Sequence, residues 1–402
     1  MNYQTEVLNK LLDKYENRTE GSNRRVLIIP DKKEISVPDT ESEDYYEFRS
    51  SMISLKEKGY IDCDWIRKDY IINSIWLQLD KAEEIYSLLN RESRTSKVSS
   101  VAAMIDNVIP QITTKWIYNY LSDSKNDLTK GNKLTGIWKK EPQFLKDFLN
   151  ALKGIDKLEN KTVSMRSFSV KIYDNSKTFE KTIKNSIIPI IKKYEPDLQY
   201  AEELADREVL AQVGIIMMSE IFEFCGKVKV NYHNGIVDYS PITKGACISG
   251  DSISEITGIS IFETDKIIFI ENKTNYTEYC LNNKSDNELV VYHGGFYSPQ
   301  RGEFFRKLCG KTEIPVFFWG DIDYGGFKMF MRLKSNIVKH LLPMNMDTDC
   351  YNRYKNNGLP RDDNYIKVLR TVTDDPDYAL FGGVINAIIE NKVTVEQESF
   401  LG

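Results

Sequence analysis

The chain has 402 residues, of which 41% are hydrophobic and 28% charged, a composition typical of a globular protein with room for two or three domains. The N-terminus lacks the pattern of a secretory signal, no apolar run approaches the ~20 residues that span a bilayer, and the six cysteines are scattered. These features predict a cytoplasmic protein without a zinc site or a disulfide framework. Because only three histidines occur, carboxylates are the expected chemical groups.

The net charge of −5 is unevenly distributed along the chain. Residues 125–193 carry 16 Lys and Arg against 7 Asp and Glu, whereas residues 1–95 and 255–402 are both net acidic. Phosphate groups respond to such a local surface rather than to the charge of the whole chain. The basic stretch, which contains Lys139 and Lys140, is therefore a candidate DNA-binding region. A solvated, lysine-rich helical surface is the alternative.

Residues 1–95 begin with two segments of helical periodicity, 4–17 and 43–58, with the short apolar segment RRVLIIP between them. Two strand-like segments, IDCDWI and DYIINSIWLQLD, follow Gly59. This order is typical of a winged helix and predicts a DNA-binding domain, with Arg49 of the second helix as a candidate DNA contact. A small α+β domain that mediates protein contacts has the same order of elements.

Residues 96–254 are expected to form a largely helical, basic region that leads into a catalytic domain. Within it, the segment MRSFSVKIYDNSKTFEKTI has apolar residues at alternate positions, Phe168, Val170 and Ile172. We expect a strand there, then a turn at 174–176 and a helix from about Thr178.

From residue 255 short apolar segments alternate with amphipathic ones. The apolar segments are KIIFIE, ELVVY and IPVFFWGDID, and the intervening helices are expected over 276–281, 299–308 and 326–340. This α/β pattern predicts a Rossmann-like, mostly parallel sheet with helices on both faces. Functional sites of such sheets lie at the carboxyl ends of the strands.

Three acidic residues fall at those strand ends. Glu271 ends KIIFIE, while Asp321 and Asp323 follow PVFFWG and are one residue apart, so that both point to the same side of an extended chain. Oxygen ligands suit a hard cation such as Mg²⁺ or Mn²⁺, which would also offset the repulsion between the carboxylates. A plain helix cap is the alternative for an Asp at this kind of junction.

FIENKTNY and FFWGDIDYGGF resemble sequences of the nuclease subunits of the Wadjet anti-plasmid defence systems, a family related to the A subunit of topoisomerase VI. MRSFSVKIYDNSKTFE is similar to the segment before the catalytic domain in that family, and VTVEQESF is similar to its closing Glu-Gln-Glu motif. The resemblance covers most of the chain and is clearest over 160–180 and 255–400. It implies a Toprim catalytic domain over 255–402, preceded by winged-helix and helical regions.

The resemblance also implies metal-dependent cleavage of double-stranded plasmid DNA by a homodimer that an SMC–kleisin type complex activates. Position by position, Asp321 and Asp323 match the Asp-x-Asp pair that holds Mg²⁺, and Glu271 matches the Toprim glutamate. By this analogy Glu271 either completes the metal coordination or acts as the general acid/base on the phosphodiester oxygens. Mn²⁺ is the expected substitute. The closing motif supplies two further candidate metal ligands, Glu396 and Glu398.

Two positions beside the glutamate bear on this expectation. Typical Toprim domains have a glycine directly after the glutamate, where this chain has Asn272. The departure matches the Wadjet variant and puts topoisomerase or primase chemistry in doubt. Lys273 either pairs with a DNA phosphate or neutralises the carboxylates.

Two other functions are open at this point. A topoisomerase-like protein would break DNA with a tyrosine nucleophile, for which Tyr45 and Tyr46 are candidates. A DNA-binding adaptor would keep the acidic cluster without using it. His293, which follows ELVVY, either touches a phosphate or is structural, and the structural role is favoured.

Overall fold

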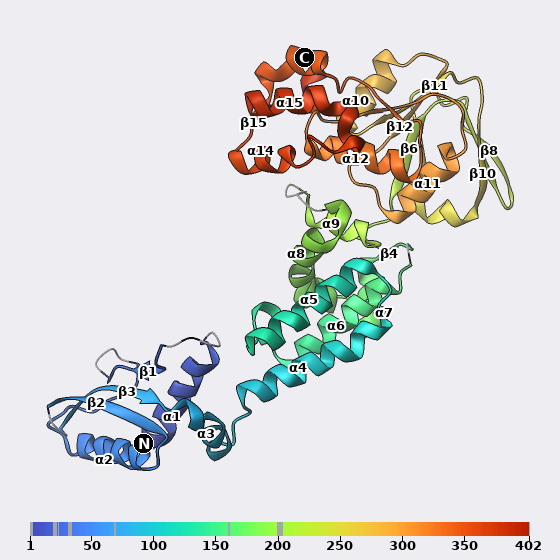
Figure 1. Ribbon diagram of the computed structural model, residues 1–402. Coiled ribbons are helices and arrows are strands. Elements are labelled where there is room, and N and C mark those ends of the chain that lie inside the picture. Colours follow the sequence, from blue (N-terminus) through green and yellow to red (C-terminus); the bar gives the residue numbers. More distant parts are fainter. Residues whose placement is uncertain are drawn as a thin grey trace. The chain divides into compact units, whose positions relative to one another are not determined.

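The computed structural model describes residues 3–18, 22, 24–30, 34–67, 70–159, 161–198 and 204–401. Contacts divide the chain into two compact units, residues 1–149 and 150–402 (Figure 1). The finer division into 1–95, 96–254 and 255–402 stays a prediction. Within the described residues, none of the helices has the length and apolar character needed to cross a membrane.

The first unit opens with a small α+β fold that contains both helices and both strand-like segments expected from the sequence, and its assignment as a winged helix stays a prediction. Its two helices cover an antiparallel sheet of order β1-β3-β2, and apolar side chains from helices and strands, such as Leu11, Phe48 and Ile75, are fully buried between them. Ser42 caps the second helix by accepting a hydrogen bond from Tyr45 N–H. The elements are α1 (Tyr3–Glu16), β1 (Leu27–Ile28), α2 (Glu43–Glu57), β2 (Ile61–Arg67) and β3 (Ile71–Leu77).

A buried arginine ties this fold to the helices that follow it in the same unit. Arg94 donates hydrogen bonds to the carbonyl oxygens of Tyr15 and Arg18 at the end of α1, and to that of Gly131 at the end of α5. A cation satisfies the free carbonyls at the ends of helices. The helices are α3 (Ala82–Leu88), α4 (Arg94–Val108), α5 (Lys115–Gly131) and α6 (Pro142–Asp156), the last of which continues past residue 149.

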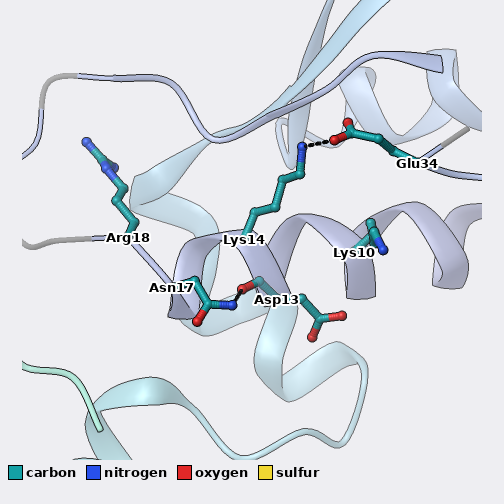
Figure 2. A pocket seen from close by; sticks show the side chains of 6 residues that line it. All are labelled: Lys10, Asp13, Lys14, Asn17, Arg18 and Glu34. Carbon is teal, nitrogen blue, oxygen red and sulfur yellow. Dashed lines mark hydrogen bonds and ion pairs between the residues drawn. The ribbon is translucent and has the colours of Figure 1, made fainter. Parts of the chain in front are cut away.

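A shallow polar pocket lies along the end of α1 (Figure 2). Lys14 spans it and forms an ion pair of 2.6 Å with Glu34, and Asn17 donates a hydrogen bond to the carbonyl of Asp13. Lys10 and Arg18 also line the pocket. Its acidic residues offset much of the positive charge, so the pocket itself is not a strongly basic surface.

The second unit begins with helices, and here one prediction is wrong. Residues 165–173 form a helix, α7, instead of the expected strand. Ser164 caps this helix, Met165 and Phe168 are buried at helical spacing, and Val170, expected to share a face with Phe168, is 48% exposed. The elements are β4 (Val163–Ser164), α7 (Met165–Tyr173), a π-helical turn (Phe179–Ile183), α8 (Lys184–Tyr194), α9 (Asp206–Gln212) and β5 (Ile215–Ile216), which pairs with β4.

A six-stranded sheet of order β14-β13-β11-β12-β6-β9 forms the centre of this unit. The four strands β14, β13, β11 and β12 are parallel, as predicted, and β6 and β9 add an antiparallel edge. Figure 1 shows α10, α11 and α12 near the labelled strands β6, β11 and β12. The elements are β6 (Ile221–Cys225), β9 (Ala246–Ser249), β11 (Lys266–Ile270), α10 (Lys273–Glu278), β12 (Glu288–Tyr292), α11 (Pro299–Cys309), β13 (Val316–Trp319), α12 (Tyr324–Asn336) and β14 (Leu342–Pro343).

Two smaller parts complete the unit. A three-stranded antiparallel sheet consists of β7 (Val228–Tyr232), β8 (Gly235–Asp238) and β10 (Ile256–Ile261). The C-terminal part returns the chain to the central sheet, because Val395 pairs with Ile322 just beyond β13. Its elements are α13 (Thr348–Tyr354), β15 (Leu359–Pro360), α14 (Asp363–Arg370), α15 (Gly382–Asn391) and β16 (Val393–Thr394), of which β15 and β16 pair.

Candidate active site

Glu271 and Asp321 meet because the strands before them are neighbours in the sheet. Ile270 pairs with Trp319 in the parallel register of β11 and β13, so the residues that follow both strands emerge at the same edge. The N–H of Glu271 donates to the carbonyl of Trp319 at 3.0 Å. In turn the N–H of Asp321 donates to the Glu271 carboxylate at 3.1 Å.

Asp323 stands at the start of α12 and caps it. One carboxylate oxygen accepts a hydrogen bond of 2.7 Å from Gly326 N–H, and the other lies 3.6 Å from the guanidinium of Arg361. A side chain at position 326 would collide with the carbonyl of Asp321, so the sharp turn into α12 requires glycine there. The helix-cap role considered for an Asp at this junction therefore exists at Asp323, beside the proximity to the other carboxylates.

The electrostatics of the cluster reflect burial and crowding. Burial, and then the charges of Asp321 and Asp323, hold the pKa of Glu271 well above its usual range. Burial, and then the charge of Asp323, raise the pKa of Asp321 to about 7, although a hydrogen bond from Gln397 N–H lowers it in part. Full ionisation of these carboxylates is therefore unfavourable in the metal-free cluster at neutral pH.

The donor chemistry of this cluster fits a hard divalent cation. Carboxylate oxygens are the ligands that Mg²⁺ and Mn²⁺ prefer, and a cation offsets the repulsion that raises the two pKa values. The side chains as they stand do not form a finished coordination shell: in the described part of the chain, no three His, Cys, Asp or Glu residues are gathered as metal ligands.

The closing motif of the chain reaches the same strand ends. Gln397 N–H donates a hydrogen bond of 2.6 Å to the Asp321 carboxylate. Glu398 accepts one of 2.5 Å from the side chain of Asn272, and both Glu396 and Glu398 contribute to the raised pKa of Asp321. All five acidic residues expected at the metal site thus lie around one edge of the sheet.

A cleft of about 570 Å³ opens beside the carboxylates. Arg361 is the one Lys or Arg among the described residues that line it, and its guanidinium lies 4.7 Å from the centre of the Tyr365 ring. The Tyr365 hydroxyl accepts a hydrogen bond of 2.8 Å from Tyr324 N–H at the start of α12. Sequence reasoning missed Arg361 and Tyr365, because no motif or periodicity connects the β15–α14 segment with the strand ends.

The four basic residues expected to contact DNA lie in different surroundings. Lys139 and Lys140 are exposed, although the Lys139 ammonium lies 3.5 Å from the side-chain oxygen of Asn17. The remaining two make contacts with protein groups. The ammonium of Lys273 forms an ion pair with Glu223. The guanidinium of Arg49 lies 6.0 Å from the centre of the Tyr70 ring.

The tyrosine candidates differ in accessibility. Tyr45 is buried, and its hydroxyl donates to the carbonyl of Tyr70 at 3.1 Å and accepts from Ile72 N–H at 3.2 Å. Tyr46 is 53% exposed. Tyr45 therefore has a structural role here, and only Tyr46 of this pair presents its side chain to solvent.

His293 is a core residue. Its ring is fully buried and stacks on Phe305, with Phe318 edge-on at 5.0 Å between ring centres. Burial, and then the charges of Arg301 and Arg332, lower the pKa of His293 to about 3, so the ring is neutral at physiological pH. The favoured structural interpretation fits this placement.

Comparison with known proteins places these residues in a family context. Residues 252–401 match the family model described as "Wadjet protein JetD, C-terminal". The chain is also 26% identical, over 412 residues, to the Wadjet protein JetD of Bacillus cereus (strain Q1), an alignment that covers 99% of this chain and 98% of the relative. The resemblance inferred from the sequence motifs is confirmed. The acidic cluster, Arg361 and the closing motif all lie inside the matched segment.

Proposed function

The chain is a homologue of the Wadjet protein JetD, and we propose that it is a Mg²⁺-dependent DNA endonuclease that acts in anti-plasmid defence. The observation that carries this proposal is the meeting of Glu271 with Asp321 and Asp323 at the carboxyl ends of parallel strands, within the family-matched segment. On this proposal the central sheet and its helices form a Toprim domain, and residues 1–95 form a winged-helix domain that binds duplex DNA.

Glu271, Asp321 and Asp323 would hold Mg²⁺, with Mn²⁺ as a substitute and with Glu396 or Glu398 as additional ligands. When bound, Mg²⁺ supplies neutralisation of the phosphodiester charge and a lowered pKa for the attacking water. Support for this assignment comes from the donor chemistry and from carboxylate pKa values that are raised by burial and mutual repulsion.

The remaining residues of the cleft would bind and orient the DNA backbone. Arg361 provides a planar cation beside the acidic cluster, a geometry suited to a phosphate oxygen. Away from the cleft, the exposed lysines of residues 125–193, Lys139 and Lys140 among them, would hold the duplex through its phosphates. We also propose that the protein is a homodimer and that an SMC–kleisin complex (JetABC-like) controls it, as the resemblance of its motifs implies.

Plasmid cleavage by the purified protein tests the proposal. We expect cutting in Mg²⁺ or Mn²⁺ and none in a chelator, with loss of activity in Asp323→Ala. Asp347→Ala is the matched control, since Asp347 also caps a helix of this unit, α13, by accepting from Cys350 N–H at 2.8 Å. Equal activity of the two variants would remove the proposed site.

The same assay separates the two other functions. A tyrosine mechanism leaves protein covalently joined to DNA after denaturation, and Tyr46→Phe would abolish that adduct. An adaptor binds DNA but does not cut it under any metal condition. Protein-free ends that depend on Asp321 support hydrolysis.

A further inference from the structure

A buried glutamine joins the two strands that precede the carboxylates. Gln397 is fully buried, whereas its neighbours Glu396 and Glu398 are exposed. Its side-chain oxygen accepts a hydrogen bond of 2.8 Å from Asn272 N–H, and its side-chain nitrogen donates one of 3.0 Å to the carbonyl of Trp319. One amide group therefore connects the residues at the ends of β11 and β13.

This connection continues the hydrogen-bond ladder of the sheet. Glu271 N–H donates to the carbonyl of Trp319, a main-chain bond between the two strands. The next residue, Asn272, is the N-cap of α10 and gives its N–H to Gln397. Because a side-chain amide carries donor and acceptor groups as a peptide unit does, Gln397 provides an additional rung where the strands separate. The backbone of Glu271 is thus fixed by two hydrogen bonds, one from its own N–H to Trp319 and one from the N–H of the next residue, Asn272, to Gln397.

The main chain of the same residue holds the second carboxylate. Gln397 N–H donates to the Asp321 carboxylate at 2.6 Å, and the carbonyl of Gln397 accepts a bond of 2.8 Å from the side chain of Asn275. The pairing of Val395 with Ile322 sets the register of this segment.

We propose that Gln397 is a positioning residue of the active site, which fixes Glu271 through the backbone of Asn272 and orients Asp321 directly. This inference rests on the proposed nuclease function and deepens it. A displacement of about 1 Å in a reacting group costs on the order of 10²-fold in rate, so loss of the bridge lowers the cleavage rate. DNA affinity stays unchanged, because the buried side chain is not available to touch DNA.

Two variants and a matched control test the proposal. Gln397→Met removes both side-chain bonds at nearly constant size, and Gln397→Glu keeps the acceptor for Asn272 N–H while lacking the donor to Trp319. Gln300→Met is the control, because the Gln300 amide likewise donates to a main-chain carbonyl of this unit, that of Gly250, at 2.7 Å. The readouts are hydrogen exchange of the Asn272 amide, Mn²⁺ affinity of the DNA-free protein, and single-turnover cleavage with DNA affinity measured separately.

In Gln397→Met we expect about tenfold faster exchange at Asn272, about tenfold weaker Mn²⁺ binding and about 10²-fold slower cleavage with unchanged DNA affinity. Gln397→Glu keeps slow exchange at Asn272, and Gln300→Met resembles the wild type throughout. If Gln397→Met does not fold, Gln397→Glu is compared with Gln300→Met, and slower cleavage with weaker Mn²⁺ binding in the former supports the proposal.

The positioning role would be overturned if Gln397→Met kept the wild-type exchange rate at Asn272 and the wild-type Mn²⁺ affinity. It would also be overturned if Gln300→Met lost Mn²⁺ affinity and cleavage rate to the same extent as Gln397→Met. The proposed function fails in a different way: the wild-type protein would then neither bind Mn²⁺ nor cut DNA. In that case exchange at Asn272 still decides whether Gln397 holds the strand end.

Discussion

The N–H of Asp321 donates a hydrogen bond of 3.1 Å to the carboxylate of Glu271, which lies 50 residues earlier in the chain. This bond offsets only part of the cost of burying the carboxylate. Burial, and then the charges of Asp321 and Asp323, leave the pKa of Glu271 well above its usual range. Because the unfolded chain releases this proton at a lower pH than the folded chain does, the raised pKa of Glu271 lowers the stability of the metal-free protein near neutral pH.

Glu271→Gln separates charge from hydrogen bonding at this position. The glutamine oxygen can still accept from Asp321 N–H, but the side chain can no longer ionise. We expect the metal-free variant to unfold at a higher temperature than the wild type near neutral pH, by about 2–4 °C for each kcal/mol of relief. We also expect Mn²⁺ to stabilise it less and cleavage to fall by at least about 10²-fold. Thermal unfolding with and without Mn²⁺ measures this, and a lower midpoint with undiminished stabilisation by Mn²⁺ contradicts it.

Arg361 is expected to contribute to the cleavage rate more than to DNA affinity. Its guanidinium lies 3.6 Å from Asp323, and its Nε donates to the Thr394 hydroxyl at 2.8 Å, so it is held beside the carboxylates. Arg361→Gln should slow single-turnover cleavage by about 10–10²-fold, with Arg361→Lys in between, because lysine keeps the charge but loses the planar fork. Lys392→Gln, which breaks an exposed ion pair with Asp363, is the control. A wild-type cleavage rate in Arg361→Gln would show that Arg361 does not contribute to cleavage.

Reversing charge in the basic stretch should weaken DNA binding for all sequences alike. Lys139 and Lys140 are both exposed, so their change to Glu leaves the core intact. For each lysine–phosphate interaction that the change removes, the slope of log affinity against log salt should fall by about 1. Binding isotherms at several salt concentrations test this, with Lys311→Glu and Lys339→Glu, exposed and outside the stretch, as the control pair. An unchanged slope would mean that the stretch is only solvated surface.

His293 gives the fold a defined pH dependence. Burial lowers its folded-state pKa to about 3, against ~6.5 for an unperturbed histidine, and Arg301 and Arg332 act in the same direction. As the pH falls, His293 takes up a proton in the unfolded chain before it does so in the folded protein. The neutral, buried His293 therefore makes its full contribution to the free energy of unfolding above pH ~6.5. Below that pH the contribution decreases by up to about 1.4 kcal/mol per pH unit. His293→Phe should therefore lose less stability between about pH 7 and 5 than the wild type, as measured by denaturant unfolding. His340→Gln, at an exposed histidine, should follow the wild type.

The carboxylates at the strand ends were predictable from the sequence, whereas the contacts that distant segments make with them were not. KIIFIE and PVFFWG are continuous apolar runs because parallel strands are buried on both faces, and that local signal identifies Glu271 and Asp321. The same kind of signal misled at residues 165–173, where apolar residues alternate but Phe168 is buried at helical spacing from Met165. Gln397 reaches the site through contacts between segments distant in sequence, which leave no periodic trace. The family motif alone pointed to it.

The isolated protein is expected to be a weak nuclease that a partner controls. Residues 255–402 carry 17 basic against 21 acidic residues, so this segment attracts phosphate poorly without help. For the proposed homodimer, we expect the two active sites to be too far apart for one relaxed duplex and to accept DNA only when it is bent. Bending a short site by 40–90° costs roughly 1–6 kcal/mol, enough to exclude relaxed DNA and to admit DNA that the proposed SMC–kleisin complex has strained.

Plasmid cleavage with and without that complex tests the gate, on circular and linear DNA, in Mg²⁺ and in Mn²⁺. We expect slow, unselective cutting by the protein alone and a large acceleration by the complex on circular DNA. A pre-bent minicircle should be cut faster than a linear fragment of the same sequence even without the complex, because its strain replaces part of the bending cost. Asp321→Ala should remove all of these activities together. Rapid cutting of linear DNA in Mg²⁺ by the protein alone would exclude the gate and leave an unregulated nuclease.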